Sequence, residues 1–182
     1  KMSKATYEQF LNDNASKKQE KEEQLKNEKE KQEWLNFIKI FYDQVNEWLK
    51  PFVEDGRMQT NFVQNNLTEE YIGTYSVDNM EVMFAGQKLT FAPIGTLLIG
   101  TKGRIDLIGP KGSVQFILVD QDSTELKVKV TIRSASTPAP KEEPSKKIEW
   151  TWKIIERTSS RIKYIDFSED NFFDALMGLV NG

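Results

Sequence analysis

The sequence predicts an α+β protein, with helices at both ends flanking an antiparallel sheet. Apolar residues recur every three or four positions before residue 52, then alternate with polar residues from about Tyr71 to Asp166. Helical spacing returns after Ser168. Because the strands are grouped apart from the helices, we expect a β-meander of about seven to nine strands, forming a curved sheet or a partial barrel.

The first 33 residues predict a charged helix that extends into solvent. Thr6 is a suitable cap, and Tyr7, Phe10 and Leu11 fall on one side of the helix that it would begin. Residues 12–33 are almost wholly polar, with Lys and Glu often four positions apart, a spacing that supports an isolated helix. We therefore expect a coiled-coil-like helical extension at 1–33. The apolar stripe that follows from Trp34 spans little more than two heptads, and the polar stretch before it breaks the repeat, so we do not expect an extended coiled coil.

A second helical pattern begins at Trp34 and opens the core domain, which we expect to be a single unit covering 34–182. Its apolar residues repeat at alternating spacings of four and three, as on one face of a buried helix. They are Trp34, Ile38, Phe41, Val45, Trp48 and Phe52. We expect this face to pack on the sheet, and we expect the helix to end near Leu49 because Pro51 disfavours helical geometry before it.

The sheet region contains strand patterns separated by turn residues. A hairpin with glycine in its turn is predicted at 81–91, and a mobile proline-rich loop at 134–146. Further strands are predicted at 96–99, 104–108, 113–119, 125–133, 148–154 and 162–166. Ser168 then caps a short final helix with an acidic first turn.

The residue inventory excludes most catalytic classes. The chain has no histidine and no cysteine, which removes histidine-based triads, thiol nucleophiles and the commonest metal ligands. Gly95 to Lys102 superficially resembles a phosphate-binding loop, but Thr101 precedes Lys102 and a strand follows where that motif needs a helix. We therefore expect no enzyme activity, no cofactor and no metal site.

Nothing in the sequence predicts a membrane protein. No apolar run approaches the roughly 20 residues needed to cross a bilayer. The charged N-terminus also lacks the apolar stretch of a secretory signal, so we expect a cytoplasmic location.

Positive charge is concentrated in the sheet region. Residues 85–163 carry 14 Lys and Arg against 8 Asp and Glu, a net of +6 in a protein whose net charge is −3. Candidates for binding an anion or an acidic partner are Lys102, Arg104, Lys111, Lys127, Lys129 and Arg133. A solvated sheet face explains the same pattern, so nucleic-acid binding is possible but is not favoured.

The leading functional hypothesis is a non-catalytic protein-interaction module such as an adaptor, an inhibitor or an immunity-type protein. Its N-terminal helix would bind a protein partner or self-associate. The alternatives are nucleic-acid binding through the basic sheet face and a small hydrophobic ligand enclosed by the curved sheet. Candidate residues lining such a pocket are Phe91, Phe116, Trp150 and Trp152.

Overall fold

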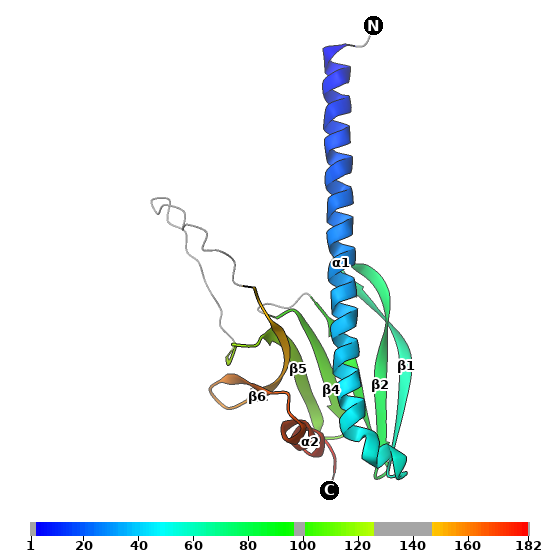
Figure 1. Cartoon of the computed structure of the whole chain (residues 1–182), viewed down its shortest axis with the longest axis vertical. Helices are drawn as coiled ribbons and strands as arrows, with labels where there is room; N and C mark the ends of the chain where they lie inside the picture. Colours follow the sequence, from blue (N-terminus) through cyan, green and yellow to red (C-terminus); the bar gives the residue numbers. More distant parts are fainter. Residues whose placement is uncertain (1–2, 97–100, 126–146, 182) are drawn as a thin grey trace.

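The computed structural model describes residues 3–96, 101–125 and 147–181. Two helices and seven strands follow one another in this part of the chain (Figure 1). They are α1 (Lys4–Glu54), β1 (Met58–Glu69), β2 (Gly73–Phe84), β3 (Gln87–Gly95), β4 (Gly103–Gly109), β5 (Gly112–Asp120), β6 (Trp150–Arg157), β7 (Ile162–Asp166) and α2 (Glu169–Met177).

The strands form one antiparallel sheet in chain order, from β1 at one edge to β7 at the other. Within the described residues β1 and β7 do not pair, so the sheet is open rather than a closed barrel. Helix α1 crosses one face of this sheet, and its first half continues well beyond it (Figure 1). The predicted α+β fold, with a long helix, a meander and a short final helix, is confirmed.

Individual strands agree with the prediction to different degrees. The patterns at 104–108, 113–119 and 162–166 correspond to β4, β5 and β7. The predicted strand at 125–133 and the loop at 134–146 lie outside the described residues, apart from a single bridge between Glu125 and Lys163. Most of the predicted strand at 96–99 also lies outside them.

The hairpin between β2 and β3 has the predicted glycine turn. Phe84 and Gln87 pair across a two-residue loop formed by Ala85 and Gly86. Both loop residues have positive φ angles, 50° for Ala85 and 71° for Gly86. Such turns match the right-handed twist of the flanking strands, and glycine adopts the required conformation without steric cost.

The predicted start of the first helix at Thr6 and the predicted end of the second near Leu49 were both wrong. The two helices are one continuous helix, α1, which begins before Thr6 and ends after Leu49. The N-cap is Ser3, whose side chain accepts a hydrogen bond from the Thr6 amide at 3.2 Å, so Thr6 lies inside the first turn. Pro51 also lies inside the helix, and the Asp55 amide still donates to the Pro51 carbonyl at 3.2 Å. The proline is tolerated because the amide it lacks would have bonded residue 47, which is exposed and can be solvated by water.

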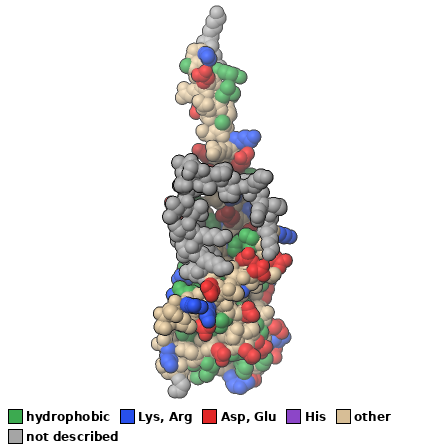
Figure 2. Space-filling view, turned by 90° about the vertical axis from the view of Figure 1, so that its left-hand side faces the viewer, with side chains coloured by type: hydrophobic (Ala, Val, Ile, Leu, Met, Phe, Trp, Pro, Cys, Tyr) green, Lys and Arg blue, Asp and Glu red, His purple; other side chains and the backbone are tan. Residues whose placement is uncertain are grey.

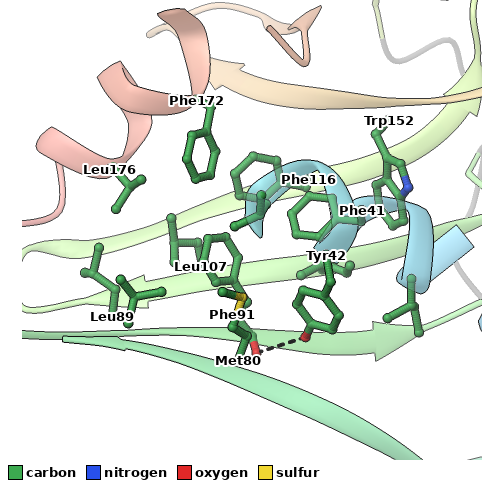
Figure 3. Packing of buried hydrophobic residues seen from close by; sticks show 14 of the residues in the cluster. Phe41, Tyr42, Met80, Leu89, Phe91, Leu107, Phe116, Trp152, Phe172 and Leu176 are labelled. Carbon is green, nitrogen blue, oxygen red and sulfur yellow. Dashed lines mark hydrogen bonds between the residues drawn. The ribbon is translucent and has the colours of Figure 1, made fainter. Parts of the chain in front are cut away.

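The predicted apolar face of α1 forms the centre of the core. Its buried residues are Trp34, Ile38, Phe41, Tyr42, Val45 and Leu49. Figure 3 shows Phe41 directed into the sheet between Phe116 and Trp152. The ring centroids of Phe41 and each of these two residues are 5.1 Å apart. The expectation that this helix packs on the sheet is therefore confirmed.

Helix α2 closes the core at the end of the chain. Ser168 is its N-cap and accepts a hydrogen bond from the Asn171 amide at 3.3 Å, as predicted. Phe172 and Leu176 are buried against the core, and the Phe91 and Phe172 rings stack at 6.2 Å. The acidic first turn lies at the positive end of the helix dipole.

Candidate functional site

The most distinctive surface of the molecule is the first half of α1. Every residue from 4 to 26 is exposed, and we call this segment the arm. At 1.5 Å per residue the arm is roughly 35 Å long. In Figure 2 its upper part stands clear of the rest of the molecule and carries hydrophobic side chains among polar ones. Since most of a helix's stability comes from packing an apolar face, so long an unpacked segment needs an explanation.

Three apolar residues gather on one side of the arm near its start. Tyr7, Phe10 and Leu11 are spaced three and four residues apart, which places them on one helical face. Their exposed fractions are 55%, 59% and 48%. Together they form a small apolar patch, here called the arm patch, at the part of the chain farthest from the sheet.

Beyond the arm, a largely buried polar network joins α1 to the sheet. Trp34 donates its indole N–H to the Tyr75 hydroxyl at 2.9 Å, and that hydroxyl donates to the Glu69 carboxylate. The other carboxylate oxygen accepts from the amide and the hydroxyl of Thr96, at 2.7 and 2.8 Å. These contacts join α1 to the end of β1, to β2 and to the residue that follows β3. We call the four residues the anchor network.

Gly103 allows Trp34 of α1 to pack closely against β4. The Trp34 ring lies directly against this glycine, and a Cβ atom there would overlap the ring. Trp34 itself has no exposed surface. Only glycine lets β4 approach the indole this closely, so the base of the arm depends on both the polar network and this steric fit.

Two of the predicted anion-binding residues are already engaged in ion pairs. Lys102 Nζ lies 2.9 Å from Glu33 Oε2 and above the Trp150 ring, 5.1 Å from its centroid. Arg104 binds Asp106 through two hydrogen bonds, of 2.8 and 2.9 Å.

The other four candidates do not extend a patch in the described part of the chain. Lys111 is exposed at the turn between β4 and β5. Lys127, Lys129 and Arg133 lie outside the described residues. Binding of an anion by this set therefore stays a prediction.

The predicted pocket-lining residues belong to the packed core. Phe91 and Phe116 have no exposed surface, Trp152 is 5% exposed and Trp150 is partly buried. The Phe41 ring lies against Phe91, Phe116 and Trp152 (Figure 3). Side chains of α1 thus occupy the space on the sheet that the alternative of an enclosed ligand would require.

A groove lies instead between α1 and the hairpin of β1 and β2. It is open to solvent, has a volume of about 460 Å³, and has an apolar floor flanked by polar side chains. Its apolar lining consists of Leu35, Ile38, Tyr42, Phe62 and Val77. Sequence reasoning missed the groove because it did not predict β1, which contributes Phe62.

Two tyrosines, Tyr42 in the groove and Tyr75 in the anchor network, are held in their neutral form. Burial is the largest cause that raises the pKa of Tyr42 well above its usual value, and the charge of Asp78 adds to it. Burial also raises the pKa of Tyr75, followed by its hydrogen bond to Glu69. A tyrosine whose folded pKa is raised stabilises the fold below its unfolded pKa, and this contribution is lost as the pH rises further.

We therefore expect the free energy of unfolding to fall as the pH rises above about 10, the pKa of an unfolded tyrosine. Denaturant titrations across the alkaline range would measure this decline. The decline should be shallower in a variant carrying Tyr42→Phe and Tyr75→Phe, because phenylalanine has no proton to lose. An equally steep decline in that variant would show that these two hydroxyls are not responsible.

Comparisons with known protein families, with curated proteins and with solved structures gave no match. Within the described residues, no helix is long and apolar enough to cross a membrane. The same residues contain no cluster of three or more His, Cys, Asp or Glu side chains placed to hold a metal ion. The arm and its anchor network are therefore the features on which a function can be argued.

Proposed function

We propose that this chain is a non-catalytic protein-interaction module, of the adaptor, inhibitor or immunity type, that binds its partner through the arm. The observation that carries the proposal is the arm patch. Tyr7, Phe10 and Leu11 are about half exposed on a helix whose residues 4–26 are all exposed. Aromatic side chains are enriched at protein interfaces, and an exposed cluster of them is costly in water.

The form of the arm indicates how a partner would bind. Anchors at positions i, i+3 and i+4 are typical of a helix that lies in an apolar groove of another protein. The arm is already helical, so binding would not require ordering a flexible segment. Its remaining residues carry both signs of charge in short blocks, which suits a groove with a mixed polar rim.

Two further observations support a binding role. The absence of histidine and cysteine removes the usual general base and thiol nucleophile, which favours binding over catalysis. A cysteine-free chain is also compatible with the cytoplasmic location that we propose.

The test is affinity capture from source-cell lysate with the full chain and with a variant carrying Tyr7→Ser, Phe10→Ser and Leu11→Ser. We expect a partner protein to be captured by the unchanged chain and lost with the variant. A matched control carries Met83→Ser, Ile94→Ser and Ile108→Ser, which alter exposed apolar residues on the sheet face opposite α1. Circular dichroism would check that the arm stays helical.

The control and a nuclease treatment separate this proposal from its alternatives. Retention of the partner by the arm variant and its loss with the sheet-face control would place binding on the sheet. Recovery that disappears after nuclease treatment would favour nucleic-acid binding. Thermal stabilisation by hydrophobic small molecules, without any protein partner, would favour ligand binding in the groove beside Tyr42.

A further inference from the structure

Among the residues that the structure describes, β1 is an edge strand with one side unpaired. It is 12 residues long and is bonded to β2 on one side, and among the described residues no strand lies on its other side. In Figure 1 it is the outermost strand, on the side of α1 away from β5, β6 and α2. Residues 61–66 are all exposed, including Phe62 at 45% and Val63 at 41%.

This edge lacks the devices that usually prevent strands from pairing between molecules. Natural edge strands are short, or carry lysine or proline, or are covered by other chain segments. From Met58 to Thr68 there is no charged residue and no proline. An edge that is long, uncharged and apolar at its centre is a template for another strand, so it needs a partner of its own.

The opposite edge of the same sheet is protected. Strand β7 has only five residues and carries Lys163. The Tyr164 amide donates to the Thr124 carbonyl at 2.9 Å, and Glu125 forms a bridge with Lys163, so a neighbouring segment already occupies part of this edge. The contrast places any pairing between molecules at β1.

We propose that β1 pairs antiparallel with β1 of a second copy of this chain, so that one sheet continues across a two-fold axis. Two observations favour a second copy over another partner. Without charge from 58 to 68, the strand meets no like charge when it pairs with itself. Five of its residues are also amides, which both donate and accept hydrogen bonds and so complement their own kind. They are Gln59, Asn61, Gln64, Asn65 and Asn66.

Because the β7 edge is protected, we expect the assembly to contain two copies of the chain. Head-to-tail pairing of β1 with β7 would build an open filament, whereas pairing of β1 with β1 uses the same surface twice and closes at two copies. Contact is confined to one strand and the side chains beside it. The dimer should therefore form and dissociate reversibly with concentration.

Sedimentation of the full chain over a range of concentrations tests the proposal. We expect the mass to rise from that of the 21.1 kDa chain towards twice that value. Asn61→Lys together with Gln64→Lys should keep the protein monomeric. In the β1–β2 ladder these positions face Glu81 and Asp78, so the new lysines suit the folded monomer but repel each other across a dimer.

Two controls make the result specific to this edge. Ile94→Lys with Ile108→Lys adds the same charge at exposed positions of interior strands and should leave the dimer unchanged. The variant that removes the arm patch should also still dimerise. The proposal is overturned if the unchanged chain stays monomeric at every concentration, if the β1 lysines do not affect the dimer, or if only loss of the arm patch abolishes it.

Discussion

Replacing Phe41 with alanine should lower the free energy of unfolding by about 3–5 kcal/mol, the usual cost of emptying a large aromatic site in a core. Phe41 has no exposed surface and lies at the crossing of α1 with the sheet. Its ring stacks on Phe167 at 5.0 Å and contacts Phe116 and Trp152 at 5.1 Å each. Because these neighbours come from different elements, no single one can move in to fill the space.

Equilibrium unfolding in urea would measure the loss. Ile40→Ala is the matched control, since residue 40 is adjacent in sequence but 49% exposed, and its change should stay within about 0.5 kcal/mol. If Phe41→Ala does not fold, Phe41→Leu should show a smaller loss in the same direction. Equal stability of Phe41→Ala and the Ile40 control would mean that the core is not organised around this ring.

The helices and strands that could be predicted from the sequence are those with one buried face and one exposed face. The stripe from Trp34 to Leu49 has the period of a helix, and the residues of β3 and β4 alternate, because each of these elements packs one side on the core. Strand β1 was not predicted because it lacks such a pattern. Its central residues 61–66 are all exposed, so no alternation marks them as a strand.

Long-range contacts limited the prediction of individual residues. Lys153 alternates with Trp152 and Ile154, which predicts a solvent-facing position, yet it is only 6% exposed. Its ammonium group donates to the carbonyls of Gln121 and Ser123, at 2.8 and 2.7 Å, so the turn after β5 covers it. No local pattern carries this information, because the covering residues lie about 30 positions away.

Part of the candidate site could be predicted from the sequence, and part could not. The exposed, charged character of the arm follows from its sequence, since residues 12–33 offer almost no apolar surface to pack. The anchor network does not follow from the sequence, because its members approach one another only through the registers of β1 with β2 and of α1 on the sheet. Glu69 reads as an ordinary acidic residue before a turn, yet it is 9% exposed and bonded to Tyr75 and Thr96.

Glu69 should accordingly be sensitive to substitution. Its carboxylate accepts from the Tyr75 hydroxyl and from two donors of Thr96. Truncation to alanine would leave one buried donor, on Tyr75, and two partly buried donors, on Thr96, without this acceptor. It would also remove the far end of the chain of hydrogen bonds that holds Trp34 in place.

We expect Glu69→Ala to lower the free energy of unfolding by about 1–3 kcal/mol, the cost of leaving buried polar groups unsatisfied. Glu70→Ala is the control, because that neighbouring residue is exposed and its change should be small. Trp34→Phe removes the indole donor of the same network, so its effect should not add to that of Glu69→Ala. If the two losses add fully, the two residues act independently, and the Glu69 carboxylate does not help to hold Trp34 in place.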